Sequence, residues 1–185
     1  HLKAQPQFGY RYSHWEGLPY EEAPRDLSVK LEKDKPLKLK AVFERYIHPL
    51  AEKLIINEVS ANNKKSGDWI ELYNSTKETI SLNNWVFTDG KNEFRIPDVS
   101  ITGKSYLVLC EDSTSFYQQH PEWIKVAGNF TFGLNKRRES LGLYTDKGAS
   151  VDSTSYELAP MDSTFVWSHL LPQLDNGDRK KWEVR

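Results

Sequence analysis

Alternating apolar and polar residues run through the chain from residue 54 onward and predict an all-β fold. The clearest segment is 68–74, Asp-Trp-Ile-Glu-Leu-Tyr-Asn. Successive strand residues point to opposite faces of a sheet, so we expect Trp69 and Glu71 on one face, and Ile70 and Leu72 on the other. One of these faces is expected to be core. The predicted strands are 54–59, 68–74, 84–88, 92–96, 105–110, 124–127, 139–144, 150–156 and 163–167. Their regular spacing is typical of a β-sandwich or barrel.

One helix is expected, over residues 113–120. Its sequence begins with Ser113, a residue suited to cap a helix, and it stops directly before Pro121. We expect this helix to lie in the loop between two strands.

The first 44 residues have a strand pattern of their own. Segments 9–17, 27–31 and 37–43 predict three short strands that form a meander with one apolar face. Residues 45–53 contain Pro49 and show little periodicity, so they are predicted to be a linker. The predicted organisation is a small β unit at 1–44, a linker at 45–53 and a larger domain at 54–185.

Composition narrows the classes of function. Six Trp, nine Tyr and eight Phe supply the large side chains that half-buried sheets favour, so a folded domain is expected. The net charge of −1 would not attract a polyanion, so no nucleic-acid partner is expected. No apolar run approaches the ~20 residues that a spanning helix needs, so no membrane span is expected. Because the chain begins at His1 and its only methionine is Met161, we expect an excised or processed piece of a longer protein.

The single cysteine, Cys110, lies in the apolar run Tyr-Leu-Val-Leu-Cys and excludes an intramolecular disulfide. A lone thiol inside a buried strand is expected to pack as a small apolar group. This composition is compatible with either the cytosol or the bacterial surface.

The order of several motifs resembles the lamin tail domain. The motifs are Ile56-Asn-Glu-Val59, the segment 68–74, Leu82-x-x-Trp85-x-Phe87-x-Asp89, Phe94-x-Ile-Pro97, Gly103-x-x-Tyr-Leu-Val-Leu109, Phe132-Gly-Leu-Asn135, Leu141-x-Leu-Tyr144, Gly148, Val151-Asp152 and Tyr156. This resemblance implies an immunoglobulin-like β-sandwich in the form found in bacterial surface proteins. Such bacterial domains occur beside secreted hydrolases, nucleases and spore-coat-protein-H-like kinases. In lamins the same fold is an interaction platform for proteins and chromatin.

The N-terminal unit resembles the end of the internalin-type B-repeat. The resemblance is carried by Tyr10, Tyr12, Trp15, Gly17, Leu39, Ala41, Phe43 and Glu44, and it covers about the last two thirds of such a repeat. It implies a partial repeat ahead of the sandwich.

Seven residues form the expected fold signature: Asn57, Glu58, Trp69, Glu71, Asn74, Trp85 and Asp89. The asparagines are expected to hydrogen-bond backbone groups at strand ends, and the tryptophans to anchor the core. The carboxylates of Glu58, Glu71 and Asp89, together with that of Asp68, are ligands of the kind that Ca²⁺ prefers. Their spacing fits no metal loop, so a solvated acidic edge is the simpler interpretation.

No catalytic residue, metal site or cofactor is predicted. The histidines are scattered, and no serine lies in a Gly-x-Ser-x-Gly turn. The glycines are dispersed, so no phosphate-binding loop is expected.

Two groups of residues are candidates for recognition. Lys136, Arg137 and Arg138 form a basic turn suited to a phosphate or carboxylate, although hairpin turns are also commonly charged for solubility. Trp123 and Tyr117, with Phe116, are expected to form an aromatic patch for a sugar or a protein. A helix pinned to the sandwich would show the same aromatic residues.

These observations predict a non-catalytic binding or spacer module of a bacterial cell-surface or secreted multidomain protein, with a protein or a glycan as its ligand. Neighbouring domains of the parent chain are expected as further partners. The alternative is an accessory domain of a surface hydrolase or spore-coat-protein-H-like kinase, with the catalytic domain outside this chain. A chromatin-binding function would require a basic surface, which the net charge of −1 does not favour.

Overall fold

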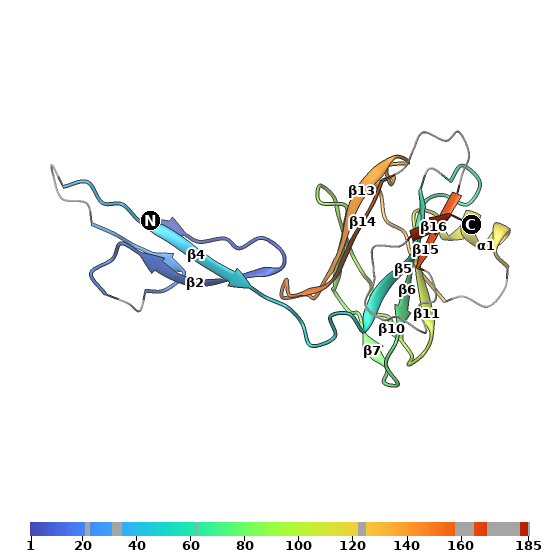
Figure 1. The fold of residues 1–185 in the computed structure, drawn as a ribbon, viewed down its shortest axis with the longest axis horizontal. Coiled ribbons are helices and arrows are strands. Elements are labelled where there is room, and N and C mark those ends of the chain that lie inside the picture. Colours follow the sequence, from blue (N-terminus) through green and yellow to red (C-terminus); the bar gives the residue numbers. More distant parts are fainter. Residues whose placement is uncertain are drawn as a thin grey trace.

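The computed structural model of the chain describes residues 1–20, 23–30, 35–61, 63–121, 125–157, 165–169 and 182–184. A small N-terminal β unit leads into a larger domain built from two packed β-sheets (Figure 1). The elements are β1 (Leu2–Lys3), β2 (Tyr10–Glu16), β3 (Asp26–Leu27), β4 (Lys40–Arg45), β5 (Leu54–Ala61), β6 (Trp69–Asn74), β7 (Ile80–Ser81), β8 (Val86–Thr88), β9 (Glu93–Arg95), β10 (Ser100–Ile101), β11 (Tyr106–Cys110), α1 (Ser113–Gln119), β12 (Val126–Gly128), β13 (Arg138–Tyr144), β14 (Ser150–Glu157), β15 (Phe165–His169) and β16 (Trp182–Val184).

The larger of the two sheets has six strands in the order β12-β11-β6-β5-β15-β16. Its neighbours are antiparallel except for β11 and β12, which are parallel. The β5–β6 register shifts between Ile56 and Glu58, which places Asn57 at a β-bulge. A bulge inserts one unpaired residue and bends the strand.

The second sheet has four antiparallel strands in the order β14-β13-β8-β9. A short antiparallel pair, β7 with β10, lies apart from both large sheets. In the four-stranded sheet, Gly142 is the register partner of both Thr88 and Ser153. These three residues therefore share one face of the sheet.

The main core lies between the two large sheets. Ile70 and Leu72 of β6 are fully buried there, together with Phe87 of β8 and Leu143 of β13. Trp85 belongs to the same cluster and is 7% exposed, as predicted for a core anchor. Burial of large apolar side chains is the main favourable term in folding, at about 25 cal/mol per Å².

The prediction that only one face of β6 is core was wrong. All six residues of β6 are buried, because Trp69 packs on the outer face of its sheet in a second cluster with Val108, Cys110 and Phe116. Phe116 comes from α1, which covers this outer face (Figure 1). Trp69 therefore anchors α1 and not the main core.

Helix α1 spans Ser113–Gln119, close to the predicted 113–120. Its N-cap is Asp112 and not the predicted Ser113: the Asp112 carboxylate accepts hydrogen bonds from the backbone N–H groups of Thr114 and Ser115. A charged acceptor at this position satisfies helical N–H groups and matches the helix dipole.

The N-terminal unit differs from the predicted meander. β2 pairs with β4, while β3 is only two residues long and pairs with β1. Neither Val29 nor Leu39 lies in a paired strand. Their apolar side chains pack against the small cluster that contains the buried Trp15, and this packing explains the alternating pattern. Trp15 Nε1 donates to Pro24 O at 3.1 Å, which holds the central side chain of this small cluster.

The predicted linker is an ordered connection over its first half. Gly9 N donates to Gly148 O and Tyr46 N donates to Gly9 O, each at 2.8 Å. Ser150 N donates to Tyr46 O, and His48 N donates to Ser150 O, also at 2.8 Å. We call this set of backbone contacts the joint, because it holds the N-terminal unit against the β13–β14 hairpin.

Most predicted strands from residue 54 onward are confirmed, with shifts of one or two residues at their ends. Residue 124 of the strand predicted at 124–127, and residues 163–164 of the last predicted strand, lie outside the described residues. The short strands β7, β10 and β16 were not predicted. Two or three residues are too few to show alternation.

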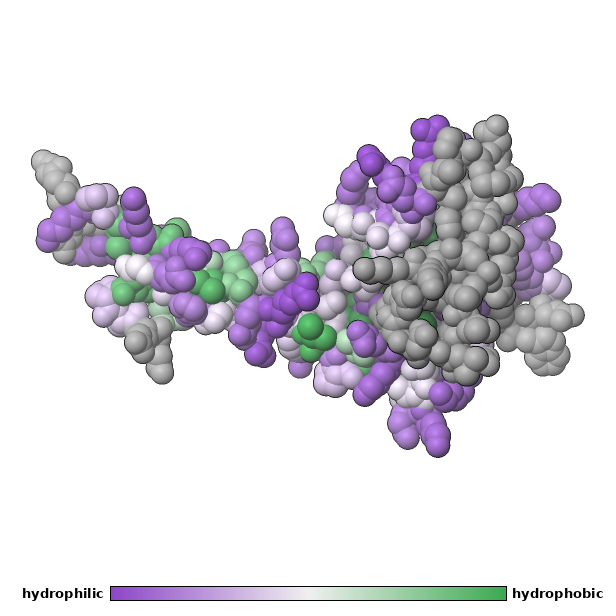
Figure 2. Space-filling view, viewed as in Figure 1, coloured by the Kyte–Doolittle hydropathy of each residue, from purple (hydrophilic) through white to green (hydrophobic). Residues whose placement is uncertain are grey.

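Apolar residues lie on the visible surface of the N-terminal unit and of the connection (Figure 2). Among the described residues, the large apolar side chains with the greatest exposure are Leu2, Tyr10, Tyr20, Leu37, Ile47 and Tyr117. All except Tyr117 lie in the N-terminal unit or in the connection. The small unit therefore buries its apolar side chains less completely than the sandwich does.

Candidate functional site

The predicted basic turn, Lys136 to Arg138, is held in shape by its own neighbours. The Asn135 side chain accepts hydrogen bonds from the backbone N–H groups of Arg137 at 2.9 Å and Arg138 at 3.4 Å. The Tyr156 hydroxyl donates to Asn135 O at 2.6 Å. All three basic side chains are exposed, and none forms an ion pair with another residue in the described ranges. The turn thus presents uncompensated positive charge at the start of β13.

The predicted aromatic patch is only partly visible. Tyr117 is 47% exposed on α1, but Phe116 is 1% exposed and packs against Trp69. Trp123 lies outside the described residues. The basic turn leads into the four-stranded sheet, whereas α1 covers the six-stranded one, so Tyr117 and the basic turn belong to different faces of the sandwich (Figure 1).

Asn74 shapes a turn, as predicted, and Asp89 shapes another, which was not predicted. The Asn74 amide donates to the carbonyl oxygens of Glu78, Ile101 and Thr102, and its Oδ1 accepts from Thr76 N. Asp89 accepts from the backbone N–H groups of Lys91 and Asn92, and these hydrogen bonds lower its pKa despite partial burial. Gly90 and Gly148 have positive φ angles, which glycine adopts without strain, and each lies in a turn of the four-stranded sheet.

Asn57 does not end a strand, contrary to the prediction. It lies at the bulge of β5 and donates from Nδ2 to Oε1 of Glu71 at 2.7 Å. Burial raises the Glu71 pKa to about 7; the hydrogen bond from Asn57 opposes this shift, and the nearby charge of Glu58 adds to it. Glu71 is 7% exposed, so it is not part of a solvated acidic edge.

Asp68 is also buried, at 5% exposure. Its carboxylate accepts from Asn63 N at 2.8 Å and Leu134 N at 2.6 Å, and so ties two loops to the start of β6. The Ca²⁺ site that the sequence disfavoured gains no support. Within the described part of the chain, no three His, Cys, Asp or Glu side chains are grouped to hold a metal ion.

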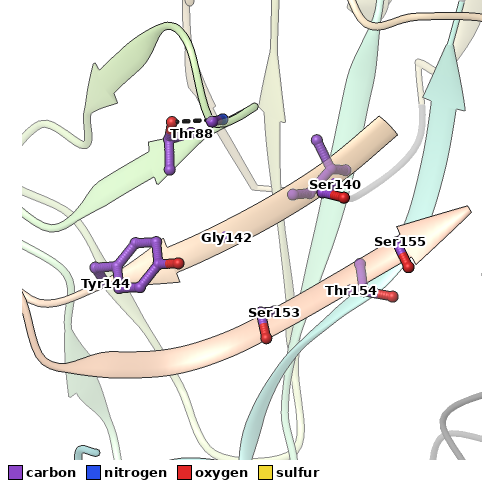
Figure 3. A pocket seen from close by; sticks show the side chains of 9 residues that line it. Thr88, Ser140, Gly142, Tyr144, Ser153, Thr154 and Ser155 are labelled. Atoms are coloured by element: carbon purple, nitrogen blue, oxygen red, sulfur yellow. Dashed lines mark hydrogen bonds between the residues drawn. The ribbon is translucent and has the colours of Figure 1, made fainter. Parts of the chain in front are cut away.

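A depression that the sequence did not predict lies on the outer face of the four-stranded sheet (Figure 3). It has a volume of about 710 Å³, within the range of ligand sites in proteins. We call it the hydroxyl trough and define it by the residues that face outward from β8, β13 and β14: Thr88, Ser140, Gly142, Tyr144, Ser153 and Ser155. Its lining contains five hydroxyl groups and no charged side chain.

Gly142 shapes the trough together with Tyr144. A Cβ atom at Gly142 would lie 2.4 Å from Cε2 of the Tyr144 ring, so only glycine lets the ring lie along the strand. Phe8 stacks on this ring with centroids 4.9 Å apart and the planes inclined by 23°. The N-terminal unit therefore holds in place Tyr144, the aromatic wall of the trough.

The sequence contained a signal for this trough that alternation alone does not reveal. The alternation predicts a polar face on one strand, with Ser140, Gly142 and Tyr144. It predicts a second polar face on the next strand, with Ser153 and Ser155. A polar outer face is ordinary for an antiparallel sheet. Small residues on two strands make a depression only where the strands pair them side by side. Here the register places Gly142 opposite Ser153 and Ser140 opposite Ser155, and the sequence alone does not give this register.

The two packed, mainly antiparallel sheets define an immunoglobulin-like β-sandwich, as predicted. Residues 49–157, more than half of the chain, match the Lamin Tail Domain family, and the chain belongs to that family. Members of this family are generally non-enzymatic modules of the kind that interacts with other proteins. The resemblance of residues 1–44 to a B-repeat lies outside the matched range and stays a prediction.

No curated protein matches the chain. Among the described residues, no helix is both long and apolar enough to cross a membrane.

Proposed function

We propose that this chain is a non-catalytic binding module of a bacterial cell-surface or secreted multidomain protein, and that its ligand is a glycan or a protein. The single observation that carries the proposal is the hydroxyl trough. It is an open depression of ligand size on the outer face of the four-stranded sheet. The bacterial surface follows from the form of lamin tail domain that the sequence resembles.

The buried polar side chains of the sandwich hold its loops and turns together. Because they have this structural role, they favour a binding function over catalysis. Asp68 holds two loops, Asn74 closes a turn, and Asp152 accepts a hydrogen bond from Ile56 N at 2.7 Å. These groups stabilise the scaffold, because a buried polar group without a partner costs about 1–3 kcal/mol. The outer face of β13 and β14 is then left to contact a ligand.

A spacer function is a second candidate, and the joint is the observation that favours it. Of its four backbone hydrogen bonds of 2.8 Å, one ties Gly9 of the N-terminal unit to the hairpin, two tie the connection to Ser150 of the hairpin, and one ties the connection back to Gly9. A fixed connection of this kind would set the orientation of whatever domain is fused to either end.

Binding of the purified 185-residue chain to a glycan array and to surface-protein extracts tests the proposal. Arg137→Ala and Tyr117→Ala probe the two surfaces predicted from the sequence, and Ser153→Trp probes the trough. A saturable ligand lost in one of these variants supports a binding module and locates its face. A folded protein that binds nothing on either platform contradicts the binding proposal and leaves the spacer or accessory-domain function.

A further inference from the structure

We propose that the hydroxyl trough binds an acidic polysaccharide, with sugar hydroxyls along the floor and a uronic-acid carboxylate at Arg138. This inference rests on the proposed binding function and adds to it the chemical class of the ligand and the residue, Arg138, that binds its charged group.

The floor of the trough suits a polyhydroxylated ligand. Serine and threonine hydroxyls each donate one hydrogen bond and accept others, which matches the mixed donors and acceptors of a sugar. Ser140, Ser153 and Ser155 alternate with inward-facing residues on two paired strands, so their hydroxyls form a grid with spacings of about 5 and 7 Å. An apolar ligand would leave these hydroxyls without partners.

Tyr144 supplies the aromatic surface that sugar rings also contact. Its ring and hydroxyl lie over Gly142 at one end of the trough, and Phe8 fixes the ring from its stacked side. An aromatic side chain that is already ordered loses little entropy when a ligand binds. The trough is therefore preorganised at this end.

Arg138 gives the opposite end a positive charge. It lies two residues before Ser140 on β13, so the two side chains share the outer face at about 7 Å spacing. Lys136 and Arg137 precede it in the basic turn. The carboxylates nearest in the register are those of Glu139, which accepts a hydrogen bond from Asn135 N, and Glu157, which lies opposite Arg138 but forms no ion pair with it. The three basic side chains outnumber the two carboxylates, so this end of the trough keeps a net positive charge.

At the other strand edge, Glu93 flanks Thr88 and is paired with Arg95 at 3.9 Å. Lys91 also lies beside Tyr144 and follows Asp89, so two cations and two carboxylates balance at this end, whereas the Arg138 end is positive. An arginine can bind a carboxylate through two parallel hydrogen bonds, which gives both affinity and orientation. A polysaccharide that carries carboxylates complements this gradient better than a neutral one.

The test measures the affinity of the 185-residue chain for polygalacturonate and for the same polymer after reduction of its carboxyl groups. Affinity electrophoresis with each polymer in the gel gives the two dissociation constants. We expect polygalacturonate to bind at least tenfold more tightly, and this preference to shrink as salt is raised because exposed charges are screened.

Two variants locate the site. Ser153→Trp fills the trough from an exposed position and should weaken binding to both polymers at least tenfold; Ser155→Trp is the second variant if the first is misfolded. Arg138→Gln should remove the preference for polygalacturonate and leave binding to the reduced polymer within twofold. Ser81→Trp on β7 and Arg25→Gln in the N-terminal unit are matched controls that should bind as the wild type does.

Equal affinity for the two polymers overturns the acidic class of ligand, and unchanged binding by both tryptophan variants overturns the trough as the site. A folded chain that binds neither polymer overturns this inference. If the array or extract screen then still yields a saturable ligand, the binding proposal survives without it. If that screen also yields no binding, both proposals fail.

Discussion

The side-chain amide of Asn57 donates a 2.7 Å hydrogen bond to Glu71 across the bulge of β5. Both residues are more than nine-tenths buried, and Oδ1 of Asn57 has no hydrogen-bond partner among the residues that the structure describes. Burial and the nearby charge of Glu58 hold the Glu71 pKa at about 7, above its ordinary 4.5. The folded state thus binds a proton there that the unfolded state releases.

Glu71 should make the sandwich less stable as the pH rises. Between pH 4.5 and 7 the folded state binds more protons than the unfolded state, so the free energy of unfolding falls by on the order of 2–3 kcal/mol. Glu71→Gln keeps the hydrogen bond from Asn57 but cannot ionise. We expect it to flatten this slope and to raise stability at pH 8, as measured by urea unfolding across the pH range. Glu78→Gln, at an exposed position, is the control; an unchanged slope in Glu71→Gln would contradict the assignment.

Asn74→Ala should be strongly destabilising. The Asn74 side chain is fully buried and serves three carbonyl oxygens and two groups of Thr76. Its removal leaves buried backbone groups without partners, at about 2–4 kcal/mol in total. Chemical denaturation measures the loss, with Asn83→Ala at an exposed position as the control. A loss below about 1 kcal/mol would show that water replaces the amide.

Gly142→Ala should disturb the trough through Tyr144. The added methyl group would collide with the tyrosine ring, so we expect a cost of about 1–3 kcal/mol. In a Tyr144→Ala background the same substitution should cost much less, because the colliding ring is gone. Thermal unfolding of the two single variants and the double variant gives this coupling. Gly133→Ala, which meets only one atom at 3.5 Å, is the control. If the stability losses of the two single variants simply add in the double variant, the tyrosine ring does not restrict the side chain at residue 142.

Phe8→Ala should loosen the joint. Phe8 stacks on Tyr144 and lies within van der Waals distance of a Cβ placed at Gly148. Without this ring, the backbone hydrogen bonds at His48 and Ser150 should open more often, so their amides should exchange with D₂O several times faster. Amide exchange followed by NMR measures the effect, and the amides of the central strand β6 serve as an internal reference. Tyr20→Ala, at an exposed aromatic position of the same unit, should leave these amides unchanged.

Cys110 should be unreactive in the folded protein. It is fully buried, and desolvation, with a smaller contribution from Asp112, raises its pKa to about 11. The thiolate is the reactive form, so a thiol reagent at pH 8 should modify Cys110 only as fast as the sandwich opens. The labelling rate should therefore rise with urea and fall in Glu71→Gln at pH 8. Rapid labelling in the absence of urea would contradict the burial of this strand.

Sequence alternation located most strands of the sandwich, because a two-residue period is strong over five or more residues, as in 69–74 and 138–144. It could not show that Trp69 and Glu71 are buried on the outer face, because that depends on α1 and on strand neighbours distant in sequence. The weak pattern at 27–31 misled for a related reason. Val29 packs against the small N-terminal apolar cluster, and a side chain can pack in this way without its backbone being part of a strand.

The candidate site was less predictable than the fold. Arg138 was identified from the sequence as part of a basic turn, but the trough beside it depends on the register between β13 and β14 and on the position of Tyr144 over Gly142. Phe8 is 136 residues away in the chain from the tyrosine it stacks on. Contacts of such long range leave no local pattern in a single sequence.

The contact between Phe8 and Tyr144 has a mechanical consequence. The wall of the trough is formed by a residue of the sandwich, but its position is fixed by a residue on the far side of the joint. Tension that pulled the N-terminal unit away from the β13–β14 hairpin would draw Phe8 off the ring and free Tyr144 to move. Force along the chain and the shape of this face are therefore linked through one pair of stacked rings.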